Sequence, residues 1–176
     1  MIKKISFLFC ISVLIICLDQ LTKTYVQTHY ALHETVSIMN NWINVTYARN
    51  FGAAFGFLDQ SDPFFRDIFM LSIPPIACMI ILIFIYFIKF ETDSINSALI
   101  NKNNTLQLTS LSSIFGGAIS NYIDRLNYGY VIDFIDFHWK IKYSFPTFNI
   151  ADCAIVTGAL LLIVSIFKEK KYVSHH

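Results

Sequence analysis

Four long apolar segments constrain this chain more than any other feature of its sequence. They cover approximately residues 5–26, 68–88, 106–123 and 148–167. Each approaches the length of about 20 mostly apolar residues that a helix needs to cross the hydrocarbon core of a bilayer. Only 14% of the residues are charged, whereas a soluble domain carries roughly 25%. We therefore predict a membrane all-α fold over residues 1–176, in which one integral membrane domain forms a bundle of four transmembrane helices.

The third segment, 106–123, differs from the others in its small residues. It contains Ser110, Ser112, Ser113, Gly116, Gly117, Ala118 and Ser120. Small side chains let neighbouring helices approach closely inside a membrane. We predict that this helix lies at the centre of the bundle.

The connections between the apolar segments are predicted to lie on alternating sides of the membrane. In the segment 34–66, apolar residues alternate with polar ones over 36–38 and 43–47, and Asn40-Asn41 offers a turn. This pattern predicts a small β hairpin or sheet on the outer surface. A second outer segment, 124–147, is rich in aromatic and acidic residues and joins the last two helices.

Lysines at the two ends of the chain predict its orientation. Lys3 and Lys4 precede the first apolar segment, and Lys168, Lys170 and Lys171 follow the last. Basic residues concentrate on the cytoplasmic side, so both termini are expected in the cytoplasm. A removable signal peptide is the alternative for the first segment, but no Ala-x-Ala-like site follows it. His175-His176 resemble the remnant of a purification tag and carry no argument.

With this topology, five acids from distant parts of the sequence lie toward the outer side: Asp19, Asp124, Asp133, Asp136 and Asp152. Ionisable groups at membrane depth are costly and usually indicate function. Each of them also has a structural interpretation.

Three of these acids are explained more simply by structure. Asp19 and Lys23 are spaced i, i+4 with the acid first, which favours an ion pair on one helix. Asp124, next to Arg125, could end a helix and anchor it among headgroups. Asp136 has the character of a solvated or interfacial acid, and Lys140 is its nearest basic neighbour in the sequence.

Asp133 and Asp152 are both surrounded by apolar residues. Asp152 follows Ile150-Ala151 with no basic residue within one helical turn, although a helix-start acid facing headgroup water would fit the same position. If the two acids meet, repulsion keeps one protonated while the other ionises. The ionised member can then take a proton from water while the protonated member polarises a carbonyl, which is aspartyl peptidase chemistry.

Two other classes of function stay open at this point. A proton relay in a small transporter or channel subunit needs similar residues, although four spans without inverted repeats make a poor transport path. A membrane assembly factor would use its acids for stability alone. Replacing Asp133 and Asp152 separately by Asn discriminates among the three, because a catalytic pair predicts severe losses of activity from both changes.

Several other kinds of chemistry are not supported. There is no Gly-x-Ser-x-Gly nucleophile motif, and Ser165-Ile166-Phe167-Lys168 lies at the cytoplasmic end. His33-Glu34 matches the start of the His-Glu-x-x-His pattern of zinc peptidases, but Ser37 stands where the second His would be needed. No metal or cofactor is expected, and a net charge of +1 gives no reason to expect nucleic acid as a partner. The four cysteines lie in apolar stretches and are read as small buried residues.

Five motifs along nearly the whole chain resemble those of the bacterial lipoprotein signal peptidase (signal peptidase II) family. They are Asp19-Gln20-Leu21-Thr22-Lys23, Asn50-Phe51-Gly52-Ala53-Ala54-Phe55-Gly56, Gly116-Gly117-Ala118-Ile119-Ser120-Asn121-Tyr122-Ile123-Asp124-Arg125, Val131-Ile132-Asp133-Phe134 and Phe148-Asn149-Ile150-Ala151-Asp152. One departure is Phe51, where the family frequently has Thr. The order and placement of all five motifs make the resemblance specific.

The resemblance implies an aspartyl endopeptidase of the bacterial inner membrane, active as a monomer near the outer face. Its substrate would be a lipid-modified prolipoprotein, reached among membrane lipids and cut before the diacylglyceryl-bearing cysteine. Asp133 and Asp152 would be catalytic. The supporting residues would be Asp19, Lys23, Asn50, Gly52, Asn121, Asp124, Arg125 and Asn149.

Overall fold

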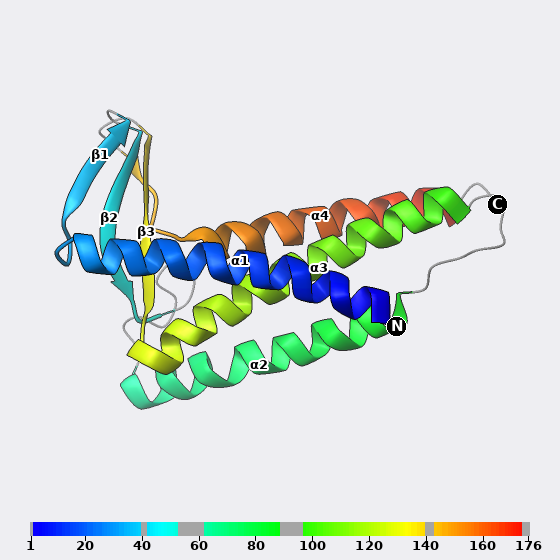
Figure 1. Cartoon of the computed structure of the whole chain (residues 1–176), viewed down its shortest axis with the longest axis horizontal. Helices are drawn as coiled ribbons and strands as arrows, with labels where there is room; N and C mark the ends of the chain where they lie inside the picture. Colours follow the sequence, from blue (N-terminus) through cyan, green and yellow to red (C-terminus); the bar gives the residue numbers. More distant parts are fainter. Residues whose placement is uncertain (1, 40–41, 53–61, 89–96, 140–142, 174–176) are drawn as a thin grey trace.

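Four helices and a small sheet make up the structure, a computed structural model that describes residues 2–39, 42–52, 62–88, 97–139 and 143–173. The helices are α1 (Ile2–His29), α2 (Pro63–Phe87), α3 (Ser97–Tyr128) and α4 (Ile150–Val173). All four run along one axis, with the strands at one end (Figure 1). The start of α1 and the end of α4 both lie toward the other end. The mainly helical membrane fold expected from the sequence is confirmed.

Three of the four helices are apolar enough to cross a membrane. Among the described residues, these spans are Lys3–His29, Pro63–Phe87 and Ile150–Lys168. Helix α3 contains the predicted third span but does not meet the same criterion, because its Ser, Asn and Gln residues lower its mean hydropathy. Its polar side chains are tolerated because this helix lies among the others rather than facing lipid on all sides.

Small residues bring α3 into close contact with two neighbours. A Cβ atom added at Gly116 would lie 2.9 Å from the Cα atom of Ser12 on α1. One added at Gly117 would lie 2.5 Å from the carbonyl oxygen of Ala151 on α4. No real Cβ fits at such distances, so these glycines set the spacing of the helices. The central position predicted for this helix follows from these contacts.

The half of the bundle that lies away from the sheet is held by an apolar cluster and by one lysine. Buried residues of α1, α2 and α3 pack together there: Leu8, Ile81, Ile85, Leu108 and Leu111, with Ile88 just beyond the end of α2. Beside them, Lys4 Nζ donates hydrogen bonds to the carbonyl oxygens of Ile85 and Tyr86, both at 3.0 Å, and to that of Ile88. These are among the last carbonyls of α2, which have no partner within their own helix. Lys4 therefore ties the start of α1 to the end of α2.

The sheet contains four antiparallel strands in the order β1-β2-β3-β4. They are β1 (Thr35–Met39), β2 (Ile43–Asn50), β3 (Val131–Trp139) and the two-residue β4 (Tyr143–Ser144). The expected pairing of β1 with β2 is confirmed, with Val36 opposite Val45. The turn expected at Asn40-Asn41 lies outside the described residues.

Strand β3 was not expected from the sequence, and it is the strand that carries Asp133. It pairs with β2, so that Ala48 lies opposite Asp133 and Asn50 lies opposite Val131. Apolar residues of both strands pack on the C-terminal end of α1 in a buried cluster of Val26, Tyr47, Ile132 and Phe134. This packing fixes the sheet, and therefore Asp133, against the helices.

The cysteines are less buried than expected. Only Cys78 is buried, while Cys10, Cys17 and Cys153 are exposed on helix surfaces. All three exposed residues lie within predicted spans, where an outward-facing side chain would meet lipid. A thiol is apolar enough to suit that environment as well as a protein core.

Candidate active site

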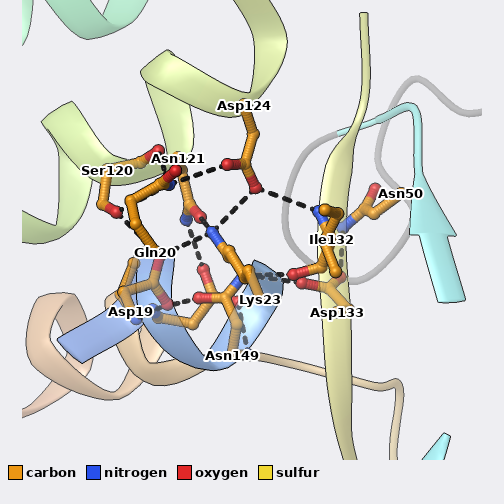
Figure 2. Close-up of polar contacts among 12 residues, drawn as sticks. Asp19, Gln20, Lys23, Asn50, Ser120, Asn121, Asp124, Ile132, Asp133 and Asn149 are labelled. Atoms are coloured by element: carbon orange, nitrogen blue, oxygen red, sulfur yellow. Dashed lines mark hydrogen bonds and ion pairs between the residues drawn. The ribbon is translucent and has the colours of Figure 1, made fainter. Parts of the chain in front are cut away.

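Asp133 is buried at the edge of the sheet nearest to the helices. Its side chain is 1% exposed. Asn149 donates from Nδ2 to Oδ1 at 2.7 Å, and Asn50 donates from Nδ2 to Oδ2 at 3.0 Å. Both oxygens therefore accept a hydrogen bond from an uncharged amide (Figure 2).

Asp152 lies in the first turn of α4 and takes part in starting that helix. Its backbone N–H donates to Asn149 Oδ1 at 2.9 Å, while its Oδ2 accepts from the backbone N–H of Asn149 at 3.1 Å. This reciprocal arrangement is a capping box at a helix N-terminus. The helix-start interpretation of Asp152 is thus correct, but it uses only one carboxylate oxygen. The other, Oδ1, accepts from Asn121 Nδ2 at 2.8 Å.

Two asparagines link these carboxylates, which we call the acid pair (Asp133 and Asp152). Asn149 Nδ2 donates to Asn121 Oδ1 at 3.1 Å, in addition to its bond to Asp133. Asn149 Oδ1 accepts from a backbone N–H, so its NH₂ group must point toward Asp133 and Asn121. The orientation of the Asn149 amide is therefore fixed, because a backbone N–H can only donate a hydrogen bond.

Lys23 fixes the second amide in the same manner. Its ammonium group donates to Asn121 Oδ1 at 2.8 Å. Because an ammonium group can only donate, the NH₂ group of Asn121 is left to face Asp152. Lys23 is also the centre of the lysine cluster (Asp19, Lys23 and Asp124), in which its Nζ lies 2.6 Å from Asp19 Oδ2 and 2.9 Å from Asp124 Oδ2.

The ion pair predicted between Asp19 and Lys23 is confirmed, but its setting is a buried one. Both side chains are almost inaccessible to solvent. Asp19 also accepts from Ser120 Oγ at 2.7 Å and from the backbone N–H of Ala151 at 2.9 Å. Asp19 on α1 thereby caps the N-terminal turn of α4 as well as binding Lys23.

Asp124 does not end a helix among headgroups, as the sequence suggested. Helix α3 continues past it to Tyr128, and Gly129, with φ of 76°, closes the helix through its N–H bond to Arg125 O at 3.0 Å. Asp124 is buried and accepts from Gln20 Nε2 at 2.8 Å and from Ile132 N at 3.1 Å. It connects α1, α3 and the start of β3.

Arg125 and Gly52 lie beside the acid pair. Arg125 Nη2 donates to Gly52 O at 3.0 Å, and Gly52 N donates to Asn50 Oδ1 at 3.0 Å. Nε of Arg125 is buried without a hydrogen-bond partner among the described residues. The guanidinium group thus holds the segment that carries Asn50.

Asp136 is buried rather than solvated, which corrects the expectation for this residue. Its Oδ2 accepts from Thr46 Oγ1 at 3.2 Å and from Asn44 Nδ2 at 3.4 Å, and it lies 2.7 Å from His138 Nε2. These partners lie on β2 and β3, whose pairing the sequence did not reveal. Lys140, the neighbour expected from the sequence, lies outside the described residues.

The electrostatics of Asp133 fit a carboxyl group that holds a proton near neutral pH. Burial and, second, the nearby charge of Asp152 raise the pKa of Asp133 to about 7. Hydrogen bonds from Asn50 and Asn149 and the charge of Lys23 act in the opposite direction. The acid pair can therefore share one proton, the state that general acid and base catalysis by two carboxylates requires.

Sequence reasoning did not single out two side chains of this network, Gln20 and Ser120. Both lie inside motifs that it quoted, and Gln20 Nε2 reaches Ser120 Oγ at 3.1 Å and Asp124 Oδ1 at 2.8 Å. A signal was present, because Ser120 and Asp124 are spaced i, i+4 and so share one face of α3. Within the part of the chain that the structure describes, no group of three His, Cys, Asp or Glu residues could hold a metal ion.

Comparison with known proteins places these residues in context. Residues 11–168 match the family described as Signal peptidase (SPase) II. The "Lipoprotein signal peptidase" of Syntrophus aciditrophicus is 39% identical over 170 residues, which are 96% of this chain and 98% of that protein. The protein of the same name from Clostridium tetani is 38% identical over 92% of this chain and 93% of its own length. A solved structure described as a bacterial membrane enzyme, determined in meso at 2.3 Å, superposes with a TM-score of 0.76 at 29% identity, over 94% of this chain and 90% of that one.

Proposed function

Because this chain belongs to the signal peptidase II family, we propose that Asp133 and Asp152 are the catalytic carboxylates of its reaction. Membership makes the protein a lipoprotein signal peptidase, an aspartic-type membrane protease that removes signal peptides from prolipoproteins. Membership in this family also rules against the transporter and the assembly factor that the sequence alone left open. The observation that carries the assignment of the pair is its hydrogen bonding through Asn121 and Asn149, two amides that are bonded to each other.

In the proposed mechanism the acid pair holds one proton, which we place on Asp133, whose pKa burial and the charge of Asp152 raise to about 7. The ionised Asp152 takes a proton from a water molecule, whose oxygen attacks the carbonyl carbon of the scissile peptide bond. Asp133 donates a hydrogen bond to the carbonyl oxygen as negative charge develops there. Asp152 then passes the proton that it took from water to the amide nitrogen, and the C–N bond breaks. The products are the signal peptide's new carboxyl group and a new amino terminus, and Asp152 is ionised again while Asp133 keeps its proton.

The supporting residues have distinct parts in this mechanism. Asn121 and Asn149 hold the two carboxylates in position, and Asn50 donates a hydrogen bond to Oδ2 of Asp133. Lys23, which is paired with Asp19 and Asp124, holds Asn121, and Asp19 caps the start of α4. Arg125 holds Gly52 beside Asn50.

The depth of the site supports a substrate anchored by lipid. Asp152 lies about 24 Å along α4 from Lys168, at about 1.5 Å per residue. If Lys168 marks the inner boundary of a hydrocarbon core of about 30 Å, Asp152 lies about 6 Å inside the outer boundary. A diacylglyceryl group on the cysteine after the scissile bond would hold the peptide at that level. We propose cleavage on the amino side of this cysteine.

The proposed setting is the bacterial inner membrane, with both termini in the cytoplasm. The ends of α1 and α4 that bear Lys3, Lys4 and Lys168 both lie away from the sheet (Figure 1), and basic residues favour the cytoplasmic side. Both carboxylates of the acid pair come from one chain, which supports action as a monomer.

The test is cleavage of a diacylglyceryl-modified precursor by purified protein in detergent or lipid. Asp133→Asn and Asp152→Asn should each lower kcat by about 10²- to 10⁴-fold, the range for loss of a general acid or base. Asp62→Asn is the matched control, because Asp62 is an exposed N-cap of α2 and Asn caps equally well. A precursor without the lipid measures the lipid requirement.

Circular dichroism of each variant verifies that it is folded. Wild-type rates in either folded acid-pair variant would refute the assignment of that residue. A folded but inert wild-type protein would refute the proposed substrate.

A further inference from the structure

Four side chains form a stack beside the segment that carries Asn50. The guanidinium carbon of Arg49 lies 4.7 Å from the ring centroid of Tyr130. The rings of Tyr130 and Phe51 follow, with centroids 5.4 Å apart, and the guanidinium carbon of Arg66 lies 5.4 Å from the Phe51 ring. This cation–ring stack (Arg49, Tyr130, Phe51 and Arg66) encloses two rings between two cations, and each contact is attractive.

The stack lies where the pairing of β2 with β3 ends. The last backbone pair is Asn50 with Val131, so Phe51 and Tyr130 are the next two residues in antiparallel register. Cross-strand aromatic contacts stabilise such pairs. The ring contact thus extends the strand pairing by one step, directly after the residue that binds Asp133.

Arg66 occupies an unusual place for a cation, in the first turns of a helix. The positive end of the helix dipole disfavours basic residues there. Asp62 fixes the start of this helix by accepting from Phe64 N at 3.0 Å and Phe65 N at 3.3 Å. Arg66 also contacts Asp67, with Nε and Oδ1 3.3 Å apart. Its contact with Phe51 joins the fixed start of α2 to the end of β2.

We propose that Phe51 is a positioning residue that holds Asn50 against Asp133 by stacking between Tyr130 and Arg66. The inference rests on the proposed catalytic role of Asp133. Phe51 touches neither carboxylate of the acid pair in the contacts above, so its effect on the reaction passes through Asn50, whose Nδ2 lies 3.0 Å from Asp133 Oδ2.

A pH profile distinguishes positioning from a general loss of stability. The bond from Asn50 favours the ionised form of Asp133 and lowers its pKa. Loosening Asn50 should raise that pKa. The alkaline limb of the pH profile, where kcat/KM falls as the pH rises, should then move to higher pH. The other charged groups that act on Asp133 are Asp152 on α4, Lys23 on α1 and Arg125 on α3, and none of them contacts Phe51 in a described interaction.

The experiment compares Phe51→Ala with Phe51→Tyr and with Phe64→Ala, using the lipid-modified precursor. Phe64 is 76% exposed on α2, whereas Phe51 is 40% exposed. Phe51→Ala should lower kcat by about 2- to 12-fold, the equivalent of one aromatic contact, and shift the alkaline limb upward. Phe51→Tyr should restore both quantities, and Phe64→Ala should change neither.

A double-mutant cycle with Tyr130→Leu provides the second measurement. The two changes should be non-additive, because each removes the same ring contact. An unchanged alkaline limb in Phe51→Ala, or additive losses in the cycle, would overturn the inference. Asn50→Ala separates this failure from failure of the proposed function: if Asn50→Ala moves the limb and Phe51→Ala does not, only the inference about Phe51 is lost.

Discussion

Two sets of carboxylates lie next to each other at the end of the bundle that carries the sheet, and they differ in the groups between them. Asp19, Asp124 and Asp133 are buried, and Asp152 is partly buried. In the lysine cluster, Asp19 and Asp124 share the ammonium group of Lys23. In the acid pair, Asp133 and Asp152 share two neutral amides, those of Asn121 and Asn149. Among the residues that the structure describes, no lysine or arginine forms an ion pair with either member of the acid pair.

This difference separates structural from reactive acids. A shared cation compensates the charges of Asp19 and Asp124, so both can stay ionised inside the protein. Neutral N–H donors orient a carboxylate without cancelling its charge, so two such carboxylates favour a shared proton. The same residue type therefore serves as a fixed support in one set and as the proposed acid and base in the other.

The largest change in stability is expected when the shared cation is removed. Lys23→Met leaves Asp19 and Asp124 buried without compensation, which should lower the free energy of unfolding by about 3–5 kcal/mol. Thermal unfolding in detergent measures this loss. Lys168→Met, at an exposed lysine of α4, is the control and should be nearly neutral.

A triple variant sharpens the same point. Asp19→Asn, Lys23→Met and Asp124→Asn together remove all three charges and keep acceptor oxygens for Ala151 N and Ile132 N. If uncompensated charge is the cause, the triple variant should be more stable than Lys23→Met alone. Equal or lower stability would show that the lysine cluster does not act by charge compensation.

The acid pair should instead be recognised by its pH dependence. The pKa of Asp133 is raised to about 7, so its protonated form favours the folded state. That contribution to stability is complete below about pH 4 and is lost as the pH rises through about 7. The rate constant kcat/KM should fall over the same alkaline range, with an apparent pKa that belongs to the pair.

Asn50→Ala tests this assignment within the site. It removes a donor to the ionised form of Asp133, so the alkaline limb of kcat/KM should move to higher pH. The measurement is the pH profile of cleavage beside the wild type. A limb that stays in place or moves to lower pH would contradict the assignment of the raised pKa to Asp133.

The smallest effect is expected at Asp136, a buried acid of the sheet that belongs to neither set. Asp136→Asn should lower the free energy of unfolding by about 1 kcal/mol, because it weakens hydrogen bonds to Thr46 and His138. Its kcat/KM should stay within about twofold of the wild type. A loss as large as that of the acid-pair variants would break the comparison by making Asp136 part of the reaction.

Local patterns were enough to predict the helices and the first hairpin. Apolar runs located the helices, and alternation over 43–47 located β2. The pairing of β2 with β3 joins residues far apart in the sequence, such as Ala48 and Asp133, and no local pattern contains that contact. The missing strand explains why Asp136 was taken for a solvated acid.

Motifs in the sequence predicted the residues of the site, but they did not predict the hydrogen bonds that join these residues across different helices and strands. The ion pair of Asp19 with Lys23 follows from helical spacing, but the bond from Ala151 N to Asp19 Oδ1 requires α1 and α4 to meet. The position of Asp124 was misjudged because helix ends are poorly marked when a helix continues beyond the apolar run. The catalytic role of Asp133 and Asp152 stays a prediction until the variants are measured.

The bond between Asp19 and Ala151 also has a consequence for how the protein is made. A chain is synthesised from its amino terminus, so the helix that contains residue 19 is complete long before residue 151 is added. The first turn of α4, which carries Asp152, receives a cap from Asp19 only after the two helices dock. A nascent chain therefore has no complete acid pair, and the proposed protease is latent throughout its own synthesis.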